Sequence, residues 1–257
     1  MVSMVELANK IRKTVLEMIY KAQSSHIGSC FSCIDLLTVI YMKSKLEDKI
    51  LISKGWVAAP VYALLAEKGI IPKKDLERYC KEKEKQYIGL LEPMKGVSFA
   101  GGSMSMGIAA GVGFALAKKL NNDKSRVYVL ESDGGLNGGI TWEAAAIAAH
   151  HRLDNLIVII DMNGLQAMGS TSDILNMEPL RDKWKSFGWE VREVNGHNHI
   201  TIEQALFYPP LYKGKPIVIL AKTIKGKGVS FFENNNLYHY KNLTAKEYLL
   251  ARKELNG

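Results

Sequence analysis

The stretch VYVLESDGGLNGGITWEAAAIAAHHRLDNLIVIIDMNGL, residues 127–165, decides the fold. An apolar run at 127–130 leads into a glycine-rich turn, and an alanine-rich segment with helical spacing follows at 143–151. A second apolar run at 156–160 leads into a polar turn. This order predicts a strand, a helix and a second strand, which together form one βαβ unit of a parallel sheet.

The turns after the two predicted strands carry polar side chains. Asp133 follows the first strand, and Asn163 follows the second about thirty residues later. Open parallel sheets bind ligands outside the carboxyl ends of their strands. Carboxylate and amide oxygens, with water and a phosphate, suit Mg²⁺, and glycines let backbone N–H groups approach phosphate oxygens. The alternative is structural: Asp133 caps the next helix and Asn163 adopts a left-handed turn.

Length and composition are those of an ordinary globular protein. The 257 residues suffice for one large α/β domain or at most two small ones, with 47% hydrophobic and 23% charged residues. The net charge is +8, but the lysines are scattered and the densest run, at 81–85, alternates in sign. This pattern indicates a solvated helix face and argues against a nucleic-acid-binding patch.

The cysteines and the lengths of the apolar runs indicate the cellular compartment in which the protein is expected. Cys30, Cys33 and Cys80 are odd in number and suggest no disulfide framework. Cys30 and Cys33 have C-x-x-C spacing, but no second pair completes a zinc site, so they are expected to be a buried structural pair. The first residues lack the apolar core of a signal peptide and no apolar run reaches about 18 residues, so a cytoplasmic protein is expected.

The rest of the chain alternates predicted strands and helices, which favours a parallel sheet with helices on both faces in a single domain, residues 1–257. Ser32, Thr201 and Thr244 are expected to cap helices, Thr244 within a capping box. A long loop is expected at 86–105 and a basic loop at 222–227. The predicted helices are 5–23, 33–42, 60–68, 72–84, 106–120, 143–151, 180–187, 201–206 and 243–255, and the predicted strands are 49–53, 127–130, 156–160, 190–194 and 216–221.

The stretch also resembles the thiamine-diphosphate motif, which begins Gly-Asp-Gly and ends at an Asn roughly thirty residues on. Together with the Trp-Glu-Ala-Ala helix at 142–145 and the Lys-Trp…Phe-Gly-Trp segment at 183–189, it resembles the amino-terminal, diphosphate-binding part of transketolases. The similarity is strong from about residue 97 to 232 and traceable back to His26. It implies the thiamine-diphosphate-binding fold, with thiamine diphosphate and Mg²⁺ as cofactors.

The resemblance also assigns cofactor-binding residues. By position in the family's motifs, the metal ligands are Asp133, Asn163 and the backbone carbonyl of Leu165; the diphosphate meets Gly134; the aminopyrimidine meets backbone groups of Gly102 and Met104; and Ile224 is an apolar cofactor contact. The segment around Gly102 and Met104 departs from the family's Thr-Gly-(Ser/Pro)-Leu-Gly-Gln-Gly in its side chains, which backbone contacts tolerate.

Histidines of the substrate channel distinguish this chain within the family. His26 and His239 match two of them and are the expected catalytic residues, which bind sugar hydroxyls and move protons. Trp56, also expected beside the cofactor, replaces a third, and it offers one N–H donor on a bulky ring and accepts no proton. The fourth is lost where the Gly-His-Pro segment is shortened to residues 90–93. An unusual donor or acceptor sugar is therefore expected.

Two further features concern assembly. Gly138 replaces a glutamate that in the family helps to link two active sites across a dimer. The family's catalytic glutamate lies in a separate pyrimidine-binding domain, and full-length members are over twice this length. The resemblance thus implies one subunit of a split transketolase, inactive alone and paired with a carboxy-terminal subunit in an α2β2 assembly.

Two alternatives remain open. One keeps the cofactor but changes the reaction, as in decarboxylating or carboligating 2-oxo-acid enzymes. The lost histidines favour it, and the Lys-Trp…Phe-Gly-Trp segment opposes it. The other is a cofactor-free structural or regulatory homologue, which the retained Asp133 and Asn163 oppose.

Overall fold

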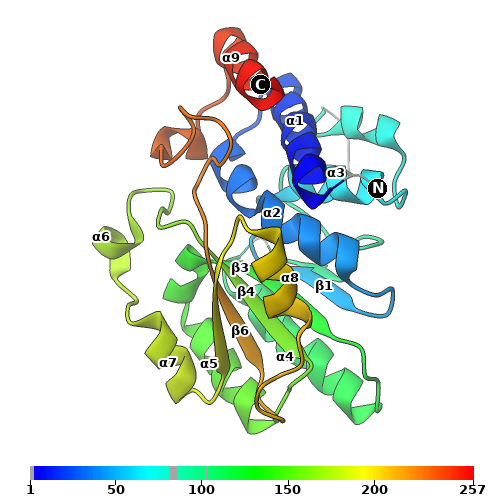
Figure 1. Cartoon of the computed structure of the whole chain (residues 1–257), viewed down its shortest axis with the longest axis vertical. Coiled ribbons are helices and arrows are strands. Elements are labelled where there is room, and N and C mark those ends of the chain that lie inside the picture. Colours follow the sequence, from blue (N-terminus) through cyan, green and yellow to red (C-terminus); the bar gives the residue numbers. More distant parts are fainter. Residues whose placement is uncertain (1–2, 82–85, 102) are drawn as a thin grey trace.

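The protein is built on a six-stranded, fully parallel sheet with the order β2-β1-β3-β4-β6-β5. The computed structural model describes residues 3–81, 86–101 and 103–257. Figure 1 shows β3, β4 and β6 side by side in the middle of the molecule. The strands are β1 (Lys49–Ile52), β2 (Phe99–Ala100), β3 (Val127–Ser132), β4 (Leu156–Met162), β5 (Glu190–Asn195) and β6 (Ile217–Lys222).

Helices cover both faces of the sheet, as the sequence predicts. Successive side chains of a strand point to opposite faces: Ile157 and Ile159 of β4 join one buried cluster, and Val158 and Ile160 join the other. The first cluster includes residues of α1 (Met4–Ala22), α2 (Ile27–Lys43), α3 (Ala58–Glu67), α8 (His199–Phe207) and α9 (Ala245–Asn256). The second includes residues of α4 (Met106–Leu120), α5 (Gly139–His150) and α7 (Leu180–Ser186).

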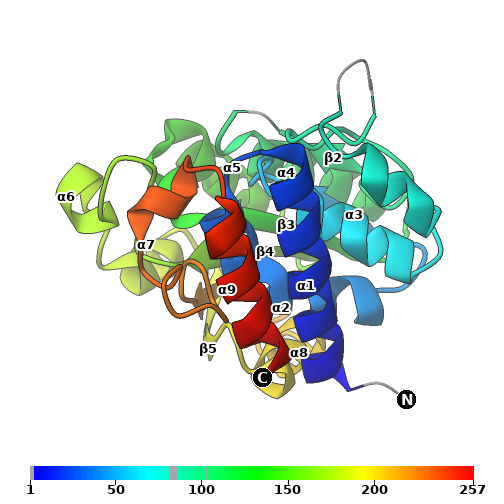
Figure 2. The same ribbon diagram turned by 90° about the horizontal axis from the view of Figure 1, so that it is seen from above.

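The first and last helices pack together outside the sheet. Figure 2 shows α1 and α9 side by side, and the rings of Tyr20 and Tyr248 stack with centroids 4.1 Å apart. A capping box begins each helix, and the one formed by Thr244 and Glu247 confirms the prediction for α9. No described helix is long and apolar enough to cross a membrane.

Two predicted helix starts are wrong. α2 begins at Ile27, directly after His26 in a left-handed conformation (φ 73°), and not at residue 33. Ser32 is therefore no cap: it is fully buried, and its hydroxyl donates to Asp161 of β4 over 2.6 Å. Asn198, not Thr201, caps α8, since its side chain accepts two backbone N–H groups.

Of the remaining differences, one is the start of α5, at Gly139 and not at residue 143, and the others involve short elements. The predicted helix at 72–84 is a 3₁₀ turn, η1 (Lys73–Arg78), while residues 82–84 lie outside the described residues. The predicted loop at 86–105 contributes β2, which pairs with β1. Three short elements were not predicted from the sequence: η2 (Asp133–Asn137), α6 (Thr171–Leu175) and η3 (Asn236–His239).

Candidate active site

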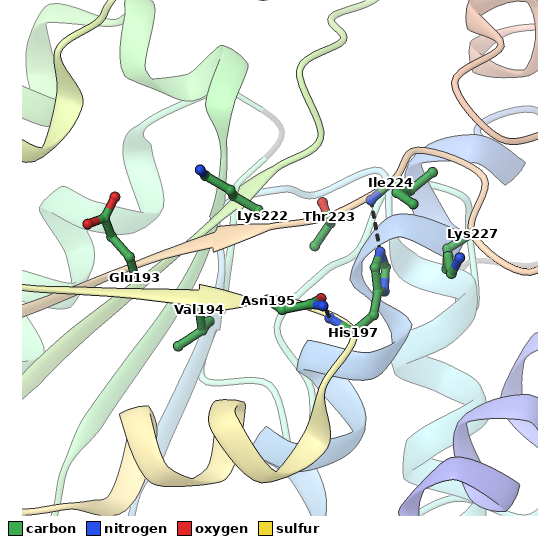
Figure 3. A pocket seen from close by; sticks show the side chains of 8 residues that line it. All are labelled: Glu193, Val194, Asn195, His197, Lys222, Thr223, Ile224 and Lys227. Atoms are coloured by element: carbon green, nitrogen blue, oxygen red, sulfur yellow. Dashed lines mark hydrogen bonds between the residues drawn. The ribbon is translucent and has the colours of Figure 1, made fainter.

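A cavity of 540 Å³ lies at the carboxyl ends of β1, β3 and β4, and we call it the main cavity. It brings together eight of the ten residues assigned from the sequence: His26, Trp56, Met104, Asp133, Gly134, Asn163, Leu165 and His239. Ile224 lines another cavity, of 660 Å³, at the ends of β5 and β6 (Figure 3), which we call the second cavity. Gly102 lies outside the described residues.

Asp133 and Asn163 meet because their strands are neighbours in register. Ser132 pairs with Asp161, so the turns after β3 and β4 lie together. The two oxygens of Asp133 accept the N–H groups of Gly134 (2.8 Å) and Gly164 (2.7 Å), which fixes the carboxylate. The Asn163 side chain accepts the Leu165 N–H over 3.1 Å.

Neither of the two structural roles expected as alternatives, a helix cap for Asp133 and a left-handed turn for Asn163, is found. Ser132, not Asp133, caps the turn that follows β3, since its hydroxyl accepts the Gly135 N–H. The left-handed residue after β4 is Gly164 (φ 74°), whereas Asn163 does not have a positive φ. Both side chains are therefore free of these roles and line the main cavity.

The oxygens of Asp133, Asn163 and the Leu165 carbonyl fit a magnesium site. Both side chains are 8% exposed, and all three groups offer hard oxygen ligands. Within the described part of the chain, no cluster of three or more His, Cys, Asp or Glu side chains forms a complete metal cage. Mg²⁺ usually keeps water and phosphate ligands, so an incomplete set of this kind suits an ion delivered with a diphosphate.

A buried ion pair lies beneath the main cavity. Lys54 Nζ lies 2.5 Å from the fully buried Asp161 carboxylate, which also accepts hydrogen bonds from the hydroxyls of Ser32 and Thr223. Burial alone would raise the pKa of Asp161, but Lys54 and these hydroxyls hold it below its usual value. Burial and the charge of Asp161 raise the pKa of Asp133 to about 6.

His26 and His239 form a contacting pair on one wall. The backbone N–H of His26 donates to the His239 carbonyl over 2.9 Å, and the ring centroids are 4.9 Å apart. Lys225 Nζ, which is donor only, lies 2.8 Å from His239 Nδ1, so a neutral His239 carries its proton on Nε2. Burial and nearby lysines lower the pKa of His26 to about 4 and that of His239 to about 3. Both rings are neutral at pH 7, and the free ring nitrogen of His239 is a donor.

These two histidines predict a pH dependence of stability. Unfolded histidines titrate near pH 6.5, so between pH 7.5 and 5 the unfolded chain binds protons that folded His26 and His239 do not bind. The free energy of unfolding is therefore lost as pH falls through this range. Urea unfolding should show that His26→Gln/His239→Gln loses roughly 1–2 kcal/mol less than the wild type over this interval. The raised pKa of Asp133 has the opposite effect on stability, and it has this effect equally in the variant and the wild type. The difference between the two proteins therefore reports on the histidines alone.

His150→Gln, which removes an exposed histidine outside the main cavity, is the matched control. Equal losses in the double variant and the wild type would show that folding does not lower the pKa of either histidine.

Trp56 stacks on His26. The ring centroids are 4.9 Å apart with planes inclined by 8°, and Trp56 is 48% exposed. The position where the family has a third channel histidine thus presents an aromatic face beside the first one. This arrangement offers a sugar a surface for its C–H groups in place of a second imidazole.

The absence of a side chain at Gly138 leaves room for the neighbouring Ser105. A Cβ at residue 138 would lie 2.3 Å from Ser105 Oγ, which donates to the Gly135 carbonyl over 2.6 Å. The glutamate of other family members therefore has no room here while Ser105 keeps its place.

Two lysines were not assigned a role from the sequence: Lys54, which lines the main cavity, and Lys225, which contacts residues of its wall. Lys54 stands in the Ser-Lys-Gly-Trp segment, but only the fold shows that it pairs with Asp161, which is distant in sequence. Lys225 belongs to the predicted basic loop and donates to Asn236 (2.8 Å) and to the Gln166 carbonyl (3.2 Å). Burial and Lys54 lower its pKa to about 8. A basic loop next to an expected diphosphate site was the available signal.

Comparison with known proteins decides the family. Residues 3–256 match the family described as transketolase, thiamine diphosphate binding domain. The chain belongs to the transketolase family. The predicted family and fold are confirmed, as is the assignment to one half of a split transketolase-type transferase.

Similar proteins include transketolase subunits of about this length and longer single-chain transketolases. The chain is 32% identical to an apulose-4-phosphate transketolase subunit of Phocaeicola vulgatus, covering 97% of this chain and 92% of that protein. It is 36% identical to a 6-deoxy-6-sulfo-D-fructose transketolase subunit of a Clostridium species, covering 96% and 94%. It also matches the crystal structure of Campylobacter jejuni transketolase with a TM-score of 0.90 and 30% identity, covering 98% of this chain but 42% of that one.

Proposed function

We propose that this transketolase-family chain, acting as a single domain, binds Mg²⁺ and thiamine diphosphate in the main cavity and transfers a two-carbon ketol unit from a ketose to an aldehyde. A carboxy-terminal partner subunit completes the active site in an α2β2 assembly. The observation that carries the proposal is the convergence of Asp133, Asn163, His26 and His239 on one cavity at the carboxyl ends of the strands.

The relatives support the need for a partner. This chain covers more than nine-tenths of two proteins that are named as transketolase subunits. It spans about two-fifths of the solved single-chain transketolase from Campylobacter. The part that those longer chains carry in addition is expected on a second polypeptide.

The residues of this chain have distinct expected roles in the reaction. Asp133, Asn163 and the Leu165 carbonyl would hold the cation. When bound, thiamine diphosphate supplies the thiazolium carbon that takes up the two-carbon unit. Gly134 N–H and the backbone around Met104 would contact this cofactor, with Ile224 as an apolar contact.

His26 and His239 would act on the sugar. Their lowered pKa values keep both rings neutral at pH 7. His239, whose Nδ1 accepts from Lys225, would donate its Nε2 proton to a sugar hydroxyl. His26 would bind a hydroxyl and accept a proton from it, while the stacked ring of Trp56 shields one side of His26 from water.

Calorimetry with Mg²⁺ and thiamine diphosphate tests the proposal. The chain with its partner subunit should bind one cofactor per main cavity, and binding should require the cation. Absence of any binding would contradict the proposal and favour a cofactor-free homologue. Cofactor binding with release of CO₂ from 2-oxo acids, and no ketol transfer, would favour the decarboxylating alternative.

Trp56→His is expected to change the preferred sugar. The substitution restores an imidazole in the channel and removes the exposed ring face, so kcat/KM for ordinary sugar phosphates should rise about 10-fold relative to the enzyme's own substrate. A donor–acceptor screen of the assembled enzyme measures this ratio. Trp56→Phe, which keeps a ring face, should leave it unchanged, and an unchanged ratio in Trp56→His would show that residue 56 does not select the sugar.

A further inference from the structure

A buried carboxylate, that of Asp35 on α2, gathers three basic side chains from other elements. Asp35 is 3% exposed; its carboxylate lies 2.5 Å from Arg12 Nη2 of α1, 2.7 Å from His197 Nδ1 and 3.0 Å from His199 Nε2. We call Arg12, Asp35, His197 and His199 the Asp35 cluster. Burial alone would raise the pKa of Asp35, but the two histidines and Arg12 hold it well below its usual range. The carboxylate is therefore charged.

His197 connects this carboxylate to the loop after β6. The backbone N–H of Ile224 donates to His197 Nε2 over 2.8 Å, as Figure 3 shows. Because a backbone N–H only donates, Nε2 must be unprotonated. The ring proton of neutral His197 then lies on Nδ1 and donates to Asp35. The carboxylate thus selects the tautomer that accepts from Ile224.

The same loop has a second tie to the cluster. Arg12 Nε donates to the Lys227 carbonyl over 3.0 Å, while its Nη2 contacts Asp35. Ile224 and Lys227, on either side of Lys225, are therefore each hydrogen-bonded to a side chain that also contacts the Asp35 carboxylate: Ile224 to His197 and Lys227 to Arg12.

Lys225 extends from this doubly held segment to the wall of the main cavity. Its Nζ donates to His239 Nδ1 (2.8 Å) and to the Gln166 carbonyl (3.2 Å), and both partners line that cavity. The Asp35 cluster and the main cavity are thus connected through one short loop.

We propose that Asp35 and His197 are positioning residues: they hold the loop at 222–228 so that Lys225 fixes the His239 ring and the turn after Asn163 for cofactor binding. The effect on binding rests on the proposed function. The placement of the loop does not, because it is defined by hydrogen bonds within this chain.

Two variants of His197 separate its hydrogen bond to Asp35 from its hydrogen bond to Ile224. The amide nitrogen of Asn takes about the place of Nδ1, so His197→Asn keeps a donor to Asp35 but is too short to reach Ile224. The longer His197→Gln places an acceptor near Nε2 and so keeps the bond to Ile224. Asp35→Asn would leave Arg12 without its carboxylate and endanger folding, so the His197 pair is the sharper test.

The first readout is hydrogen exchange of the Ile224 amide in the full chain without cofactor. His197→Asn should speed exchange at least about 10-fold, and His197→Gln should stay near the wild type. The ¹⁵N shifts of wild-type His197 should show a protonated Nδ1 and a bare Nε2. Equal exchange in the wild type and His197→Asn, or a proton on Nε2, would overturn the proposal.

The second readout is the Kd for Mg²⁺ and thiamine diphosphate of the assembled enzyme. His197→Asn should raise it about 10-fold, within the range known for residues that orient a ligand's contacts, and His197→Gln should restore it. Faster Ile224 exchange with an unchanged Kd would overturn the link to the main cavity. If the wild type binds no cofactor, the proposed function fails, while the exchange experiment still decides the placement of the loop.

Discussion

Asp133→Asn is expected to weaken binding of Mg²⁺ and thiamine diphosphate to the assembled enzyme by roughly 100-fold or more. Asp133 supplies the one carboxylate among the three expected ligands, and its neighbours Gly134 and Gly164 already orient both of its oxygens. An amide there removes the negative charge that faces the cation. Calorimetry gives the affinity directly. In addition, the wild type at 100 times its Kd should gain about 2.7 kcal/mol of stability from the cofactor, and the variant should gain almost none.

Asp182→Asn is the matched control, because it makes the same substitution at an exposed position of α7. It should bind cofactor as the wild type does. If Asp133→Asn also bound cofactor normally, Asp133 would not be a metal ligand, and the site would have to lie elsewhere.

Asp161→Asn should cost about 3–5 kcal/mol of the free energy of unfolding. Asp161 is fully buried and accepts from Lys54, Ser32 and Thr223. An Asn side chain leaves the buried Lys54 charge without its counter-charge, and an uncompensated buried charge is strongly destabilising. Urea unfolding at pH 7 measures the loss.

The exposed pair formed by Lys43 and Glu203, 2.8 Å apart, provides the comparison. Glu203→Gln should cost less than about 1 kcal/mol, because solvent screens such pairs. A loss below about 1 kcal/mol for Asp161→Asn would mean that Lys54 is hydrated or finds another partner, contrary to the burial described.

Most of the fold could be predicted from local patterns. The apolar run at 156–160 is buried on both faces as a central parallel strand, and the small-residue helix at 106–120 packs on the sheet with its predicted bounds. The wrong start of α2 had a tertiary cause. Ser32 is a good cap by type, but its hydroxyl serves Asp161, and the helix extends back to Ile27, where it is buried in the core.

The part of the candidate site that lies within one sequence motif could be predicted. Asp133 and Asn163 end adjacent strands, so their meeting follows from the βαβ unit alone. The partners of His239 and Lys54 come from distant segments, and no local pattern places Lys225 or Asp161 beside them. His197 and His199 stood in the sequence without an assigned role, and only the fold brings them to Asp35.

The need for two subunits is tested by measuring ketol transfer by this chain alone, by its carboxy-terminal partner alone and by the two mixed, with Mg²⁺ and thiamine diphosphate present. We expect transfer of a two-carbon unit from a ketose to an aldehyde only in the mixture. Full activity of this chain by itself would contradict the assignment as one half of a split transketolase.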